Sequence, residues 1–263
     1  MTAPSRKRAP EAGAEGTRGL SRGQGPHTLA IDVGGTGLKA SVLDRDGRMI
    51  VDRVRLPTPY PCSPKVLLGA LADLTAPLPT FDRVSIGFPG VVRDGHVVTA
   101  PHFGKKAWPG YPLEEAVAER LARPARLLND AEVQGLGIIA GEGLEVVLTL
   151  GTGVGSAVFM GGWLAPHLEL AQHPLYNGGT YNEYVGKEAL ARHGKKKWNR
   201  RVLRTIEVVD SLLHYDVLYL GGGNAQHLSA DLPKSVKIAS NDTGITGGIH
   251  LWDEAVWQHM HGR

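Results

Sequence analysis

The stretch that decides the fold runs Leu29-Ala30-Ile31-Asp32-Val33-Gly34-Gly35-Thr36-Gly37-Leu38-Lys39-Ala40. An apolar run ends in an aspartate, two glycines and a threonine follow, and a second β-type run occupies residues 40–43. Short β-type runs separated by glycines predict a strand, a tight turn and a returning strand. An ordinary Asp-Gly-Gly hairpin would also explain this segment taken alone, because a glycine motif is only a hypothesis until its context is known.

The same turn carries the groups of a phosphate site. Gly34 and Gly35 allow the backbone to approach a ligand that a Cβ atom would block. Their amide groups can form a concave anion site, to which Thr36 adds a hydroxyl and Lys39 a cation. Asp32, at the strand end, could hold Mg²⁺ directly or through water, with the metal between carboxylate and phosphate.

Two further strand-then-glycine junctions follow. Residues 144–150 form a buried-type strand that Gly151-Thr152-Gly153-Val154-Gly155-Ser156 interrupts, and residues 216–220 lead into Gly221-Gly222-Gly223-Asn224. Three such junctions indicate phosphate or nucleotide binding at the strand ends of an α/β protein. A plain strand-to-helix turn remains an alternative for the third.

In their order, these motifs resemble those of the ROK sugar kinases, within the actin-like ATPase superfamily. Residues 32–36 are similar to the family's first phosphate motif, and residues 148–157 to its second, in the form typical of polyphosphate glucokinases. Gly87-Phe88-Pro89-Gly90-Val91-Val92, with Thr99-Ala100-Pro101 and Trp108 downstream, is similar to the same branch. The resemblance covers residues 28–250 and implies an α/β, two-lobed actin-like ATPase (ribonuclease H-like) fold with a cleft between the lobes.

The resemblance also implies a sugar site. Asn129-Asp130-Ala131 resembles the sugar-binding and catalytic-base motif. Among the remaining positions, those that the resemblance assigns to sugar contacts are Pro89, Gly90, Glu169, His173 and Glu183. His173 comes one position later than the family spacing, so His167 is an alternative, and a polar surface loop would explain either histidine. This departure leaves the identity of the hexose open.

Asp130 also fits the chemistry of a kinase. Phosphoryl transfer to a sugar hydroxyl needs an acceptor that orients the attacking oxygen, together with positive charge around the phosphates. A carboxylate at a strand-to-helix junction suits that role, and Asn129 offers both a donor and an acceptor to vicinal hydroxyls. The alternative is a helix N-cap, which Asn and Asp both favour.

Composition sets limits on the class of protein. The chain has 263 residues with one cysteine, Cys62, so no internal disulfide and no cysteine-based zinc site are expected. No apolar run approaches membrane-spanning length, and we expect a cytoplasmic enzyme without a membrane partner. Residues 1–27 are basic and poor in large apolar side chains, which predicts a disordered tail. We do not expect this tail to bind nucleic acid.

The remaining chain divides into an N-terminal α/β lobe, 28–128, and a C-terminal α/β lobe, 129–263, whose last helix is expected to pack back on the first. In the first lobe we expect strands at 28–31, 40–43, 49–56 and 83–87, and helices at 64–76 and 112–122. In the second we expect a helix at 131–140, strands on either side of Gly151–Gly155, two helices after Tyr181, a strand before Gly221 and a helix from Gly244.

A basic run at residues 193–201 stands out. Trp198 shares a helical face with Val202, Ile206, Val209 and Leu213, which predicts that Trp198 is buried. The cations Lys195, Lys196, Arg200 and Arg201 then project elsewhere. A stripe of cations would suit polyphosphate, a dense linear anion, although a solvated face is the common explanation.

The sequence therefore predicts a Mg²⁺-dependent kinase that phosphorylates a hexose, with glucose and its O6 as the expected acceptor. The donor would be ATP, inorganic polyphosphate or both, and we expect a homodimer. The alternatives are a sensor that binds sugar without turnover, or a kinase that uses ATP alone on a different hexose.

Overall fold

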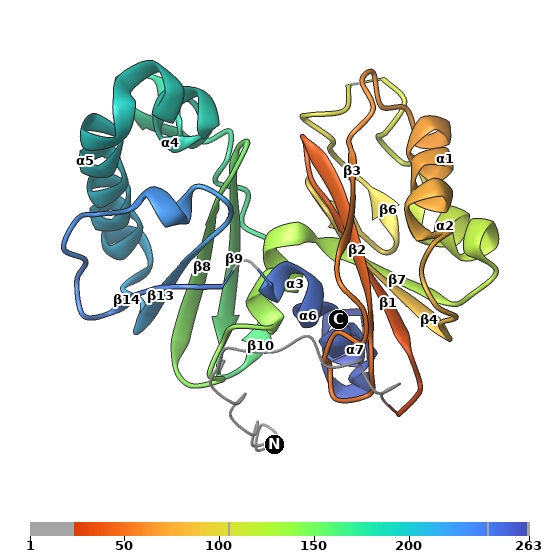
Figure 1. Ribbon diagram of the computed structural model, residues 1–263. Coiled ribbons are helices and arrows are strands. Elements are labelled where there is room, and N and C mark those ends of the chain that lie inside the picture. Colours follow the sequence, from red (N-terminus) through yellow and green to blue (C-terminus); the bar gives the residue numbers. More distant parts are fainter. Residues whose placement is uncertain (1–23, 105, 241, 262–263) are drawn as a thin grey trace.

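Two mixed β-sheets form the centres of two lobes in the computed structural model, which describes residues 24–104, 106–240 and 242–261 (Figure 1). The predicted tail, 1–27, lies outside the described residues except for 24–27, where the amide of His27 donates to Asp82 (2.7 Å). The two sheets follow each other in the sequence: the strands of the first end at Asn129, and those of the second begin at Leu144.

The first sheet has five strands in the order β3-β2-β1-β4-β7. β1 pairs antiparallel with β2 and parallel with β4, so the turn between β1 and β2 lies at the same sheet end as the end of β4. The strand bounds are β1 (Thr28–Val33), β2 (Gly37–Leu43), β3 (Val54–Pro57), β4 (Arg83–Phe88) and β7 (Ala125–Asn129). A small hairpin adds β5 (Val92–Arg93) and β6 (His96–Val97).

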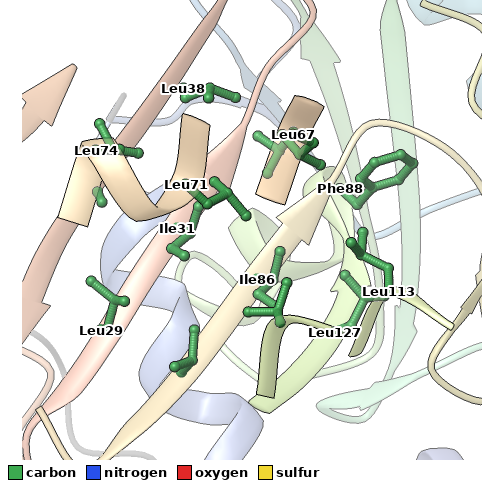
Figure 2. Close-up of a cluster of buried hydrophobic side chains, with 14 of the residues drawn as sticks. Leu29, Ile31, Leu38, Leu67, Leu71, Leu74, Ile86, Phe88, Leu113 and Leu127 are labelled. Carbon is green, nitrogen blue, oxygen red and sulfur yellow. The ribbon is translucent and has the colours of Figure 1, made fainter. Parts of the chain in front are cut away.

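Two helices cover one face of this sheet: α1 (Pro64–Thr75) and α2 (Leu113–Leu121) (Figure 1). Ser63 caps α1 through the amide of Val66, and Pro64 occupies the first turn, where its missing N–H costs nothing. Leucines of α1 recur every three or four residues and meet the apolar side chains of β1 and β4 (Figure 2). The cluster labelled there contains Leu29, Ile31, Leu38, Leu67, Leu71, Leu74, Ile86, Phe88, Leu113 and Leu127.

The second sheet has the order β10-β9-β8-β13-β14. Its bounds are β8 (Leu144–Leu150), β9 (Val154–Met160), β10 (Trp163–Leu164), β13 (Val217–Gly221) and β14 (Val236–Ile238). β8 pairs antiparallel with β9 and parallel with β13, as β1 does with β2 and β4. Two short strands, β11 (Pro174–Tyr176) and β12 (Gly179–Thr180), form a separate hairpin, and η1 (Ala225–His227) follows β13.

Helices α4 (Tyr181–Val185) and α5 (Lys187–Leu213) pack on the second sheet. Trp198, Val202, Ile206 and Val209 are buried on one face of α5, as the sequence predicts, and the Trp198 indole donates to the carbonyl of Val185 (2.9 Å). Gly194, with φ of 71°, interrupts the helix, so residues before and after it follow separate helical paths.

The C-terminal segment returns to the first sheet through α6 (Thr243–Thr246), η2 (Gly247–Trp252) and α7 (Glu254–His261) (Figure 1). Ser85 of β4 donates to the carbonyl of Gly248 (2.6 Å) and accepts from the Trp252 indole (2.9 Å). α6 and η2 also pack on α3 (Asp130–Leu136), which follows β7 and joins the lobes. The junction between the lobes is therefore made of α3 and this returning segment.

Several element boundaries differ from those predicted, and two of the predicted elements are much shorter in the structure. The expected strand at 49–56 is limited to β3, because residue Met49 forms only an isolated bridge with Leu43. The helix expected at 131–140 ends at Leu136, with Gly137 as its C-cap, and the amides of Ala140, Gly141 and Glu142 donate to the carboxylate of Glu145 instead of to a helix.

Candidate active site

A cleft of about 580 Å³ lies between the lobes. Its lining includes most of the predicted site: Asp32, Gly34, Gly35, Thr36, Lys39, Pro89, Gly90, Asn129, Asp130, Gly151, Thr152, Gly153, Glu169, Gly222, Gly223 and Asn224. The other predicted residues, His173, Glu183, Gly221, Lys195, Lys196, Arg200 and Arg201, are not part of this lining. The fold thus brings the three glycine loops and Asp130 into one space.

The first glycine loop is a tight turn at the end of β1. The amide of Gly34 donates to the carbonyl of Gly37 (3.0 Å), and a Cβ atom on Gly34 would lie 2.8 Å from that oxygen. The Thr58 hydroxyl donates to the Gly34 carbonyl (2.6 Å), which fixes the loop from β3's side. Lys39 Nζ pairs with Asp32 Oδ2 at 2.7 Å, so the predicted cation and carboxylate face each other.

The second and third glycine loops are bonded to each other. The Asn224 side chain donates to the carbonyl of Gly151 (2.9 Å), and the backbone amide of Asn224 donates to the carbonyl of Leu150 (2.8 Å). Gly222 has φ of +81°, and a Cβ atom there would lie 2.5 Å from the Leu150 carbonyl oxygen. Glycine at 222 is therefore required by close backbone packing, while Gly221 lies behind the cleft against Gln134.

Asp130 is the first residue of α3 and lies at the junction of the lobes. Its Oδ1 accepts from the amide of Ala131 (2.8 Å). Burial raises the pKa of Asp130 to about 7, with Asp32, Glu169 and Glu132 adding to the rise and the Ala131 amide opposing it. A carboxyl group with this pKa exchanges protons near neutral pH, as a general base must.

Asn129 is the N-cap of α3. Its Oδ1 accepts from the amide of Ala131 (2.9 Å), and its Nδ2 donates to the carbonyl of Gly90 (3.1 Å). Glu132 completes a capping box by accepting from the amide of Asn129 (3.2 Å). The cap interpretation therefore holds for Asn129, which fixes the Gly90 loop to the start of α3, whereas the side chain of Asp130 faces the cleft.

Glu132 extends this network to the sugar side of the cleft. His167 Nδ1 lies 2.7 Å from Glu132 Oε1, and its Nε2 lies 3.5 Å from Glu169 Oε2. Hydrogen bonds to Glu132 and then Glu169 raise the pKa of His167 to about 9, so this histidine is a cation at neutral pH. His173, in contrast, is exposed and its Nδ1 contacts the carbonyl of Pro174 (2.9 Å).

α4 contributes different residues to two hollows. Asn182 lines the cleft and accepts from the amide of Val154 (2.6 Å). Glu183 is exposed, and it completes a capping box in which it accepts from the amide of Thr180 (2.8 Å). That amide lowers the pKa of Glu183, as does the Thr180 hydroxyl.

Glu183 belongs to a second hollow of about 500 Å³, named the basic pocket here. It is lined by Tyr176, Asn177, Gly179, Glu183, Tyr184, Arg192, His193, Lys197, Arg200 and Arg201. The Arg201 guanidinium stacks over the Tyr184 ring at 4.6 Å. Lys195 and Lys196 are outside this lining, although Lys197, Arg200 and Arg201 of the same helical stretch belong to it.

The cleft also contains polar residues that the sequence did not single out for it, chiefly His102, Gln134, Asn182 and Lys187. The amide of Lys187 donates to the carbonyl of Gly151 (3.1 Å), so α5 begins at the second glycine loop. Thr180-Tyr181-Asn182-Glu183 has the spacing of a capping box, and this signal could have placed Glu183 at a helix start.

No helix in the described part of the chain is long and apolar enough to cross a membrane.

Comparisons with known proteins agree with this geometry. The family model described as "ROK family" matches residues 28–166. A polyphosphate glucokinase from Mycobacterium tuberculosis (strain ATCC 25177 / H37Ra) is 32% identical over 237 residues, covering 83% of this chain and 84% of that protein. The structure of an inorganic polyphosphate/ATP-glucomannokinase from Arthrobacter sp. strain KM aligns with a TM-score of 0.77 at 28% identity, covering 86% of this chain and 97% of that one.

A ROK family glucokinase from Streptomyces griseus, solved with glucose and AMPPNP, aligns with a TM-score of 0.71 at 20% identity, covering 86% of this chain and 98% of that one. The fold and the cleft define a two-lobed phosphotransferase of the actin-like ATPase fold, with an alcohol group as acceptor. The chain belongs to the ROK family, and its relatives include the polyphosphate glucokinases. The predictions of fold class, family and enzyme class are confirmed.

Proposed function

We propose that this sugar kinase transfers a phosphoryl group to O6 of glucose from polyphosphate, ATP or both. The observation that carries the proposal is the position of Asp130, whose pKa is raised to about 7 in a cleft that also contains three glycine loops. The polyphosphate glucokinase and polyphosphate/ATP-glucomannokinase relatives support the acceptor and both donors.

In the proposed reaction, Asp130 accepts the proton of the sugar hydroxyl as that oxygen attacks the terminal phosphorus. The new bond joins O6 to phosphorus, and the bond between phosphorus and the donor's bridging oxygen breaks. ADP, or polyphosphate shortened by one unit, leaves with the electron pair. Gly34, Gly35, Gly151 and Gly153 permit the phosphates to approach the backbone, and Lys39 supplies positive charge.

The sugar contacts in this proposal centre on Glu169. Its side chain lines the cleft and is 34% exposed, and its Oε1 accepts from the amide of Ala171 (3.0 Å). The cationic His167, fixed from behind by the buried Glu132, orients the carboxylate of Glu169. We therefore assign to His167 the role that the sequence assigned to His173.

The residues present fit a Mg²⁺ ion held mainly by the donor. Asp32 lines the cleft beside the first glycine loop, and no group of three His, Cys, Asp or Glu side chains in the described residues is arranged to hold a metal. Mg²⁺ commonly uses one or two carboxylates together with waters and substrate phosphates, so Asp32 would suffice. When bound, the ion would neutralise charge on the phosphates.

The basic pocket supports polyphosphate as a donor. Arg192, Lys197, Arg200 and Arg201 surround it, a charge that a chain of phosphates longer than ATP could use. Of the predicted polyphosphate residues, Arg200 and Arg201 line this pocket, whereas Lys195 and Lys196 do not. The cytoplasmic location, the homodimer and the absence of zinc stay predictions.

A phosphorylation assay tests the function directly. Purified protein would be incubated with glucose, mannose or galactose, each with Mg-ATP or with long-chain polyphosphate, and products identified by ³¹P NMR. We expect glucose 6-phosphate from at least one donor. Binding of glucose without phosphoryl transfer from either donor to any of the three sugars would favour a non-catalytic sensor and contradict the proposal.

A further inference from the structure

His102 lies where the glycine loops of the two lobes approach each other. It belongs to the first lobe, in the segment between β6 and α2, and lines the cleft. A Cβ atom on Gly35 would lie 3.3 Å from His102 Cγ, and one on Gly153 would lie 3.2 Å from His102 Nε2. One imidazole ring therefore lies beside the first loop with one end and beside the second loop with the other.

The segment that carries His102 is anchored by aromatic packing. Phe103 is buried, and its ring lies 5.5 Å from Phe88 and 5.8 Å from Trp108. Trp108 is fully buried and donates from its indole to the carbonyl of Cys62 (2.9 Å). Because the next residue is fixed in this core, the position of His102 in the cleft is set in advance of ligand binding.

The His102 ring is available to a ligand. Within the described residues it has no hydrogen-bond partner, although it lies in the field of Glu169. Burial lowers the pKa of His102 and Glu169 opposes that shift, which favours a neutral ring at pH 7. A neutral imidazole has one N–H donor, which can bind a phosphoryl oxygen, and protonation on phosphate binding would provide a second.

We propose that His102 contacts the phosphoryl group that is transferred, by donating a hydrogen bond to one of its oxygens between Gly35 and Gly153. The inference rests on the proposed kinase function and assigns to it a residue that binds the donor from the first lobe. The ring's position between the two glycine loops carries the inference. A hydrogen bond donated to the charged oxygens of the reacting phosphoryl group stabilises their charge throughout the transfer.

Binding titrations test this role without requiring turnover. AMPPNP, inorganic tripolyphosphate and glucose would each be titrated by calorimetry into wild type, His102→Ala and His102→Gln, with Mg²⁺ present. His96→Gln is the matched control, because His96 is exposed on β6 and is not part of the cleft lining. Thermal melting of each variant verifies that it is folded.

We expect His102→Ala to weaken AMPPNP and tripolyphosphate binding about 10- to 100-fold, with glucose binding changed by less than about twofold. His102→Gln should lose less, because its amide can donate. Weakened glucose binding with donor binding retained would identify a sugar contact and overturn the proposal. Unchanged binding of all three ligands, or no binding of either phosphate compound by wild type, would overturn it as well.

The outcomes separate this inference from the function it rests on. If wild type binds tripolyphosphate through His102 but phosphorylates no hexose, the contact stands and the kinase proposal fails. If wild type produces glucose 6-phosphate and His102→Ala binds both phosphate compounds normally, the kinase proposal stands and the role of His102 fails.

Discussion

The cleft and the basic pocket differ in how their charges are arranged. The cleft draws residues from both lobes and mixes signs, with Asp32 against Lys39 and His167 between Glu132 and Glu169. The basic pocket draws all its residues from the second lobe, and Glu183 is its one carboxylate among the described residues that line it. α4 separates the two, with Asn182 on one side and Glu183 and Tyr184 on the other.

The different surroundings in the cleft and in the basic pocket shift the pKa values of Asp130 and His193 in opposite directions. In the cleft, burial and neighbouring carboxylates raise the pKa of Asp130 to about 7. In the basic pocket, partial desolvation and then Arg201, Lys197 and Arg192 lower the pKa of His193. The cleft therefore holds a group suited to proton transfer, whereas the pocket holds a positive field suited to anion binding.

The largest effect is expected from Asp130→Asn. The substitution removes the proton acceptor but keeps the size of the side chain, so turnover should fall about a hundredfold or more. Glucose affinity should change little. Steady-state kinetics and calorimetric titration with glucose measure the two quantities separately. Retention of wild-type kcat would remove Asp130 from the mechanism.

The next effect concerns the sugar side of the cleft. Glu169→Gln should raise KM for glucose about tenfold to a hundredfold, because the hydrogen bond to the sugar loses its charged acceptor. His167→Asn should have a smaller effect in the same direction, since His167 acts by orienting Glu169. Glu183→Gln, in the basic pocket, serves as the comparison and should leave this KM within about twofold. A larger effect at Glu183 than at Glu169 would reverse the assignment.

A smaller effect is expected from the basic pocket. Replacing Arg192, Arg200 and Arg201 together with Gln should raise KM for long polyphosphate about three- to tenfold, and added salt should raise the wild-type KM, because exposed charges are screened over about 10 Å at 0.1 M. KM for ATP should stay unchanged. Lys195→Gln with Lys196→Gln, outside the pocket, is the control. Equal effects of both sets would indicate a solvated cationic face without a specific site.

A separate effect, on stability rather than on kinetics, is expected from the titration of Asp130. The pKa of Asp130 in the folded protein, about 7, lies above the ordinary value of 3.8, so the native state binds the proton more tightly than the unfolded state. Stability conferred by that proton is lost as pH rises from about 4 to about 7. The free energy of unfolding of Asp130→Asn should therefore rise relative to that of wild type by about 2.7 kcal/mol between pH 5 and pH 8, or about 5 to 11 °C in Tm. A Tm difference independent of pH would contradict a raised pKa.

Local motifs were sufficient to predict the glycine loops and Asp130. The strand-turn-strand around Asp32 and the strand before Gly151 depend on residues close in sequence, and so does the buried face of Trp198. Their meeting in one cleft follows from the repeated sheet pattern of the two lobes, which the family resemblance implied and periodicity alone did not.

Non-local contacts explain what the sequence did not reveal. His167 faces the cleft because Glu132, 35 residues earlier, binds its ring, whereas the resemblance assigned the sugar contact first to His173 and gave His167 only as the alternative. His102 enters the cleft because Phe103 is fixed in an aromatic core formed with Phe88 and Trp108. The basic run is interrupted at Gly194, where a positive φ breaks the helix. The sequence pattern assumes one continuous helix and so does not predict how the residues on either side of Gly194 are oriented.

The most direct test of the account is the pH dependence of kcat/KM for glucose, measured at saturating donor from pH 5 to pH 9. This ratio reports the essential groups of the enzyme before sugar binds. With Asp130 as the base, activity should rise tenfold per pH unit at low pH and level off above about pH 7, matching its pKa. A profile that is flat between pH 5.5 and pH 8, with turnover limited by chemistry, would contradict the assignment of Asp130.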